Sequence, residues 1–142
     1  MASESCELCD SDGGALILRT PLLRVVAVDE PDYPGFCRVV LNAHQRELTD
    51  LDAATLARVM AAVCAVEEAQ RAVLAPHKVN VASLGNVTPH VHWHVIPRFI
   101  DDAHFPQPIW GARQREPAPT VLAARRAQLP RLTDEIRARI AH

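Results

Sequence analysis

Three histidines alternate with apolar residues between Pro89 and Arg98, and this alternation constrains the local backbone more than any other feature of the chain. In an extended strand every second side chain lies on the same face, roughly 6.5–7 Å from the next. A strand would therefore present His90, His92 and His94 together on one face. The other face would carry the apolar side chains that a core needs, which are Val91, Trp93 and Val95. We expect this strand to carry the function.

The three histidines have three interpretations. They are surface residues without a role, ligands of a metal ion, or groups that perform nucleophilic and acid–base chemistry on a phosphate. Imidazole is the commonest metal ligand in proteins, and a neutral imidazole is also a competent nucleophile near neutral pH. Three matched imidazoles opposite three apolar residues argue against the first interpretation. The spacing alone leaves the other two open.

The composition is that of an ordinary single domain and excludes several classes of partner. The chain has 142 residues, of which 49% are hydrophobic and 23% charged. Its net charge of −2 provides no basic surface for nucleic acid. The polar, acidic start does not resemble a secretory signal, and no apolar stretch approaches the roughly 20 residues that cross a bilayer. We expect a cytoplasmic protein that binds neither nucleic acid nor membrane.

The apolar periodicity predicts a sheet of five strands. The strands are expected over residues 15–20, 22–28, 36–41, 78–84 and 88–98. A Gly85-Asn86 turn between the last two indicates a hairpin. Helical spacing over residues 52–75, which Pro76 ends, predicts one long helix. The fold class is therefore α+β, with a mostly antiparallel sheet, the long helix packed on it, and a C-terminal helical tail.

The run from His90 to Ile96 fits the pattern His-φ-His-φ-His-φ-φ, in which φ is apolar, and Pro97-Arg98 extends it. This motif resembles the signature of the histidine triad (HIT) family, in the form common among its nucleotide hydrolases. Within the family, the chain resembles the zinc-containing bacterial dinucleoside polyphosphate hydrolase-like type. The resemblance covers about residues 6–110 and implies a HIT-like catalytic domain over residues 1–111, with residues 112–142 as its helical tail.

The resemblance also implies the roles of individual residues. His92 would attack the α-phosphorus of a nucleotide and form a nucleotidyl-histidine intermediate that water resolves. His94 would contact the phosphate or the leaving group. Asn86 corresponds to an amide that the family has near the leaving group. An equally good interpretation is that Asn86 only forms the turn after Gly85. Asn80 is expected to face the site, and Asp29 lies where the family binds the ribose.

Cys6 and Cys9 form a Cys-x-x-Cys pair, which is either half of a tetrahedral zinc site or two incidental thiols. Several HIT proteins hold a structural zinc with such a pair. The resemblance implies that His44, after the third expected strand, and His90 complete the set. A Cys2His2 set leaves no open coordination position, so this zinc would be structural.

Trp110 has two interpretations, because the family places a C-terminal tryptophan near the active site of the partner subunit, whereas a tryptophan can also anchor the tail on its own core. The resemblance implies a homodimer, which the apolar tail residues also favour; they are Leu122, Leu129, Leu132 and Ile136. The chain departs from the family in two places. Phe36 follows Gly35 where many relatives have Gly-His, and the segment over residues 80–90 is shorter than usual.

The best hypothesis is a nucleotide hydrolase or transferase that acts at the α-phosphate of a dinucleoside polyphosphate, a nucleoside phosphoramidate or an adenylated conjugate. Magnesium would accompany a polyphosphate substrate. Two alternatives belong to other classes. One is a non-catalytic nucleotide-binding regulatory module that only grips the phosphate. The other is a metalloenzyme with a catalytic zinc on all three histidines of the motif and with incidental cysteines.

Overall fold

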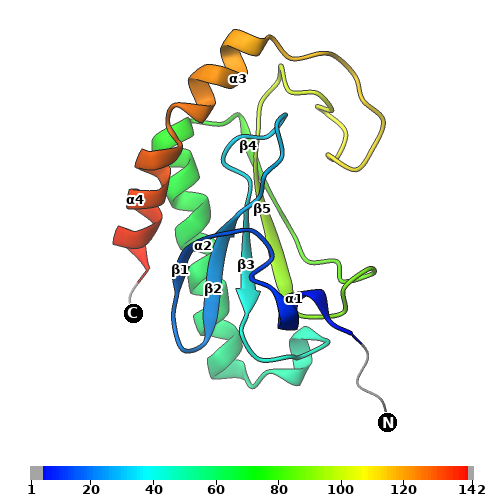
Figure 1. Ribbon diagram of the computed structural model, residues 1–142, viewed down its shortest axis with the longest axis vertical. Helices are drawn as coiled ribbons and strands as arrows, with labels where there is room; N and C mark the ends of the chain where they lie inside the picture. The colour runs from blue at the N-terminus through cyan, green and yellow to red at the C-terminus, as the bar shows by residue number, and fades with distance from the viewer. Residues whose placement is uncertain (1–4, 141–142) are drawn as a thin grey trace.

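The chain forms a five-stranded sheet in the computed structural model, which describes residues 5–140 (Figure 1). The strands are β1 Ala15–Arg19, β2 Leu23–Ala27, β3 Cys37–Leu41, β4 Lys78–Ala82 and β5 His92–Arg98. Their order in the sheet is β1-β2-β3-β5-β4, and every neighbouring pair is antiparallel. This arrangement confirms the predicted α+β fold class.

The connection between β4 and β5 is longer than the predicted turn, because it spans residues 83–91. The N–H of Val91 donates to the carbonyl of Gln45 at 2.8 Å, so this backbone pairs with the segment that follows β3. It does not extend the ladder between β4 and β5. The prediction of one strand over residues 88–98 is therefore wrong for His90, which precedes β5.

The long helix is α2, Ala53–Leu74, close to the predicted bounds. The carboxylate of Asp52 accepts a hydrogen bond from the Thr55 N–H at 2.7 Å and caps the first turn. The helix ends at Ala75, which has a left-handed φ of 48°. Its buried stripe packs on the sheet and includes Val59, Val63 and Val66. No helix in the described part of the chain is both long and apolar enough to cross a membrane.

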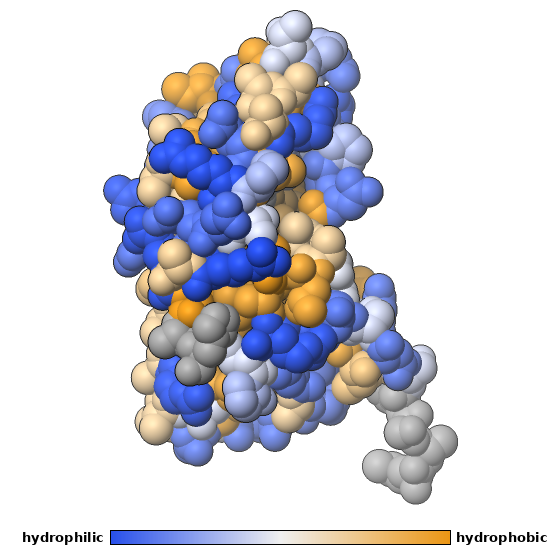
Figure 2. All heavy atoms as spheres, turned by 60° about the vertical axis from the view of Figure 1, so that its left-hand side comes forward, coloured by the Kyte–Doolittle hydropathy of each residue, from blue (hydrophilic) through white to orange (hydrophobic). Residues whose placement is uncertain are grey.

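The C-terminal tail forms two helices, α3 Pro119–Arg126 and α4 Leu129–Arg139. α4 packs beside α2 (Figure 1). Figure 2 looks toward this side of the molecule and shows many hydrophilic side chains around a smaller apolar region. The apolar residues that favour a homodimer in the sequence are packed within the chain: Leu122, Leu132 and Ile136 are buried, and Leu129 packs against the core. They therefore provide no support for a dimer.

The two faces of the sheet carry different side chains, and this difference positions the site. Along β5, Trp93 and Val95 point into the core that α2 and α4 cover. His92 and His94 lie on the opposite face. The short helix α1, Glu7–Asp10, also packs there. The alternation in the sequence thus correctly predicts that one face of β5 packs in the core and that the opposite face carries His92 and His94.

Candidate functional site

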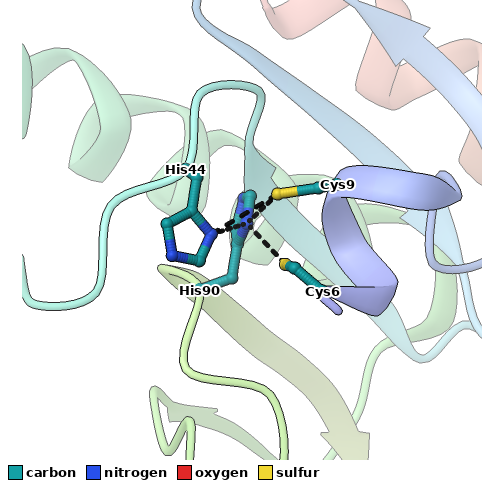
Figure 3. Close-up of side chains that lie close together, drawn as sticks. All are labelled: Cys6, Cys9, His44 and His90. Atoms are coloured by element: carbon teal, nitrogen blue, oxygen red, sulfur yellow. Dashed lines mark hydrogen bonds between the residues drawn. The ribbon is translucent and has the colours of Figure 1, made fainter. Parts of the chain in front are cut away.

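Four side chains from three distant segments converge into what we call the Cys2His2 cluster: Cys6, Cys9, His44 and His90 (Figure 3). The two cysteines belong to α1 and the residue before it, His44 follows β3, and His90 precedes β5. Their donor atoms all lie within 4.8 Å of one another. The structure therefore brings together the four residues that the sequence predicts as metal ligands.

The distances within the cluster fit a tetrahedral zinc ion. The Sγ atoms of Cys6 and Cys9 lie 3.4 and 3.5 Å from Nδ1 of His90, and the Nδ1 atoms of His44 and His90 are 3.3 Å apart. Zinc bonds of about 2.0–2.1 Å to nitrogen and about 2.3 Å to sulfur would place tetrahedral ligand atoms roughly 3.3–3.6 Å apart for these pairs. The cluster is therefore a candidate zinc site with the correct donors and the correct spacing.

The protonation of His90 also suits a ligand. Its Nε2 lies 2.6 Å from the carbonyl oxygen of Leu41, so this nitrogen carries the proton and donates. The lone pair therefore belongs to Nδ1, which faces the cluster. Burial lowers the pKa of His90, which further favours the neutral imidazole that metals bind. The carbonyl of Leu41 thus orients His90 as a metal ligand would require.

Arg24 of β2 holds the cysteine-bearing segment on the sheet. Its buried guanidinium donates to the backbone carbonyls of Leu8 and Ser11, and its Nε donates to the carbonyl of Asp12 at 3.0 Å. These bonds satisfy carbonyl groups at the end of α1 that have no partner within so short a helix. The sequence alone does not single out Arg24, although a charged residue within an apolar strand is a signal of such a role.

A second group of residues lines what we call the histidine cavity, which has a volume of about 360 Å³. It is of the size that small-molecule sites have. His92 and His94 form one wall. Other residues that line the cavity include Glu7, Arg38, Asn86 and Trp110. Four of the residues that the sequence predicts for catalysis and binding therefore meet here, namely His92, His94, Asn86 and Trp110.

His92 has the opposite protonation pattern to His90. Its Nδ1 lies 2.6 Å from the carbonyl oxygen of His90, so Nδ1 carries the proton and donates. The lone pair therefore belongs to Nε2, the outer ring nitrogen. Burial lowers the pKa of His92, and the positive charge of Arg38 lowers it further, so the imidazole is neutral at pH 7. A neutral imidazole with a fixed tautomer is the form that attacks phosphorus.

His94 is the more strongly perturbed of the two cavity histidines. Burial lowers its pKa to about 4, with smaller contributions from His92 and Arg38. Its Nδ1 is buried and has no hydrogen-bond partner among the described residues. Trp110 and Phe36 pack edge-on against its ring, with centroid distances of 5.2 and 5.7 Å. Phe36, which occupies the place of the Gly-His histidine, is thus an apolar neighbour of the site.

The loop after β5 carries Trp110 to the cavity, and Asp102 anchors this loop. The buried carboxylate of Asp102 accepts from Nε of Arg98 at 2.8 Å and from the Phe105 N–H at 2.7 Å. Burial alone would raise its pKa, but these and neighbouring hydrogen bonds lower the pKa to about 2. Trp110, which is 54% exposed, therefore contacts His94 of its own chain and does not anchor the tail in the core.

Two predicted binding residues lie outside the histidine cavity. The side-chain oxygen of Asn80 accepts from Nη1 of Arg98 at 2.7 Å and is occupied by that contact. Asp29 lies by a separate hollow that residues of α4 also line. The structure also separates the motif histidines, because His90 belongs to the Cys2His2 cluster while the other two face the cavity. This separation contradicts a catalytic zinc on all three.

Proteins of known structure that resemble this chain are histidine triad proteins. Residues 13–101 match the family model described as the HIT domain. A histidine triad protein from Bradyrhizobium japonicum is 27% identical, with a TM-score of 0.72 over 92% of each chain. One from Marinobacter aquaeolei is 24% identical, with a TM-score of 0.71 over 94% of this chain and 97% of the other. A zinc-bound histidine triad family protein from Mycobacterium smegmatis is 22% identical, with a TM-score of 0.59 over 92% and 96%.

The search of curated proteins returned no match. The HIT-domain match extends over most of the chain, so this protein belongs to the HIT family, as the motif predicts. Membership places it among nucleotide-binding proteins, a family that includes nucleotide hydrolases and also non-catalytic members.

Proposed function

We propose that this protein is a nucleotide hydrolase or transferase that acts at a nucleoside α-phosphate through a nucleotidyl-histidine intermediate on His92. The observation that carries the proposal is the hydrogen bond of 2.6 Å between Nδ1 of His92 and the carbonyl of His90. This bond keeps the proton on Nδ1 and leaves the Nε2 lone pair free to attack. It also stabilises the positive imidazolium that forms when Nε2 bonds to phosphorus.

The chemistry balances in two steps. The lone pair of Nε2 of His92 forms a bond to the α-phosphorus, and the bond from phosphorus to the leaving group breaks with its electron pair going to that group. An amine leaving group takes its proton from water, whereas a phosphate leaves as the anion. Water then attacks the same phosphorus, the P–N bond returns its electron pair to His92, and the water proton passes to solvent. Transfer to another acceptor in place of water gives the transferase reaction.

The neighbouring residues have supporting roles in this proposal. Neutral His94 donates a ring N–H to a phosphate oxygen, since its pKa of about 4 prevents it from acting as a cation at neutral pH. Asn86 and Trp110 line the same cavity and contact the nucleotide there. Asn80 and Asp29 have no place in this proposal within one chain. The homodimer and the magnesium that would accompany a polyphosphate substrate stay predictions.

We also assign a structural zinc ion to the Cys2His2 cluster. The donor set and its spacing support zinc, and the zinc-bound family member from Mycobacterium smegmatis provides a precedent. When bound, the ion would cross-link α1 to the segments after β3 and before β5. Cys6, Cys9, His44 and His90 would hold it, and with four protein ligands it would contribute stability and not a reaction step.

The test is turnover of diadenosine polyphosphates and adenosine phosphoramidate by the wild type and by His92→Ala. We expect the wild type to release a nucleoside monophosphate and the variant to lose at least about a thousandfold in kcat, because the nucleophile is gone. Mass spectrometry of acid-quenched protein should show a nucleotidyl adduct in the wild type alone. Equal metal content in both proteins is the control for intact folding.

Two results would contradict the proposal. Equal turnover by both proteins would exclude His92 as the nucleophile. Nucleotide binding without turnover by the wild type would favour a non-catalytic binding module. One contact favours that second function, because the apolar ring of Phe36 packs against His94 at the place of the auxiliary histidine of many relatives.

A further inference from the structure

Arg38 is the second residue of β3, a strand that is otherwise apolar. Its Cα pairs with that of His94 across the antiparallel ladder between β3 and β5. Directly paired residues of neighbouring strands point to the same face of a sheet. Arg38 therefore projects toward the same side as His94, and it lines the histidine cavity together with His92.

The hydrogen bonds of Arg38 are incomplete. Nη1 donates to the carbonyl of Gly13 at 2.9 Å, whereas Nε is buried and has no partner among residues 5–140. No carboxylate of the described residues lies within 4.0 Å of the guanidinium. Nη2 also makes no hydrogen bond among the described residues, so the guanidinium keeps a free donor beside the cavity that Arg38 lines.

The charges around the cavity favour an anionic acceptor. Burial lowers the pKa of Arg38, yet a guanidinium stays protonated in proteins. Its charge lowers the pKa of His94, which is neutral at pH 7. Glu7 of α1 also lines the cavity, and its negative charge raises the pKa of Arg38. Arg38 is thus the positively charged group beside the two histidines. Glu7 is a negatively charged group in the same cavity wall, and its charge disfavours an anionic ligand.

We propose that Arg38 binds the non-bridging oxygens of the phosphate that His92 attacks, and so makes the cavity specific for nucleoside 5′-phosphates over nucleosides. The inference rests on the proposed function, because it takes His92 as the attacking group. Nε–H and the outer Nη–H groups of arginine suit phosphate geometry. Because Arg38 is in place before the reaction, it also stabilises the additional charge of the transition state.

The test compares the binding of a nucleoside monophosphate with that of its nucleoside by isothermal titration calorimetry. The four common 5′-monophosphates are titrated into the wild type, and the tightest binder and its nucleoside serve as the matched probes. Arg38→Gln should weaken binding of the monophosphate on the order of 10- to 100-fold and change nucleoside binding less than about twofold. Arg38→Lys should recover part of the loss, because the charge remains but the forked donors do not.

Two further variants control for net charge. Arg58→Gln removes a charge from an exposed position of α2 and should leave both affinities unchanged. Glu7→Gln should strengthen binding of the monophosphate a few-fold and leave nucleoside binding unchanged, since it removes a negative charge from the cavity wall.

The outcomes separate the proposed residue from the proposed reaction. Unchanged monophosphate binding in Arg38→Gln, or an equal loss for monophosphate and nucleoside, would overturn the role of Arg38. The selective loss supports it whether or not the wild type turns substrate over, because binding is measured without catalysis. If the wild type shows the selective pattern but no turnover, the proposed reaction fails and the phosphate contact stands. A wild type that binds no monophosphate overturns both.

Discussion

His90 and His92 are two residues apart in one motif, yet the structure gives them opposite protonation and opposite surroundings. His90 donates from Nε2 to the Leu41 carbonyl and presents Nδ1 to the Cys2His2 cluster. His92 donates from Nδ1 to the His90 carbonyl and leaves Nε2 unprotonated. In both residues a backbone carbonyl selects the tautomer. Residue type alone therefore does not determine which ring nitrogen of a histidine carries the proton, whereas the position of one carbonyl oxygen does.

The largest expected effect tests the metal half of this comparison. Cys6→Ala should remove zinc from the cluster and lower the free energy of unfolding by about 4 kcal/mol, if free zinc exceeds its dissociation constant about a thousandfold. For a chain of this size, that corresponds to a fall in Tm on the order of 10 °C. Metal analysis and thermal denaturation measure the two quantities.

The matched control is Cys64→Ala, which removes an exposed thiol of α2 outside the cluster. It should keep both the zinc and the Tm of the wild type. If His92→Ala loses as much zinc as Cys6→Ala, the division between a metal-binding His90 and a metal-free His92 is wrong.

The pH dependence of stability tests the other side of this comparison, the buried histidines of the histidine cavity. The pKa of His94 is about 4 in the folded chain against an ordinary value of 6.5, so the unfolded chain takes up the proton first as the pH falls. The contribution of this group to the free energy of unfolding is fully present above about pH 6.5. It is lost as the pH falls toward 4, by up to about 3 kcal/mol. Urea unfolding at pH 7.5 and pH 4.5 measures the loss.

His94→Gln should reduce this difference between the two pH values, because the replacement does not titrate. The groups outside position 94 are the same in both proteins, so the comparison isolates His94. His77→Gln, an exposed histidine outside the cavity, is the matched control. An identical pH dependence in His94→Gln and the wild type would refute the burial that distinguishes this histidine.

The smallest expected effect concerns the ring that covers His94. Trp110→Ala removes an edge-on contact at 5.2 Å and should raise KM about three- to tenfold, the value of one aromatic pair. Zinc content should not change, because Trp110 lines the histidine cavity and is not one of the four residues of the Cys2His2 cluster. Ile100→Ala, an exposed apolar residue in the same loop, is the control. Equal KM values for Trp110→Ala and the wild type would remove the tryptophan from the site.

The sequence predicts the elements whose signal is local. The helical period predicts α2, and the alternation in β5 predicts which side chains face the core and which face the cavity. The family motif places His92 and His94 in one site and leads to the four members of the Cys2His2 cluster. Each of these features is contained within one short segment or one recognised pattern.

The sequence does not predict features that depend on the register between strands or on a long connection. Arg24 and Arg38 acquire their contacts only because their strands lie beside α1 and β5. His90 leaves the strand because its neighbour pairs with the backbone of Gln45. Asn80 sits on the expected strand but contacts Arg98, a choice that sequence spacing does not determine.

The two-faced β5 has a consequence for how this protein can change. Trp93 and Val95 are buried under the helices, and the same seven-residue strand carries His92 and His94 on its other side. A displacement of about 1 Å in a catalytic group can cost on the order of a hundredfold in rate. Under the proposed function, substitutions in this hydrophobic interior would therefore alter turnover without touching a ligand, and a directed-evolution screen for altered rates would recover them far from any bound nucleotide.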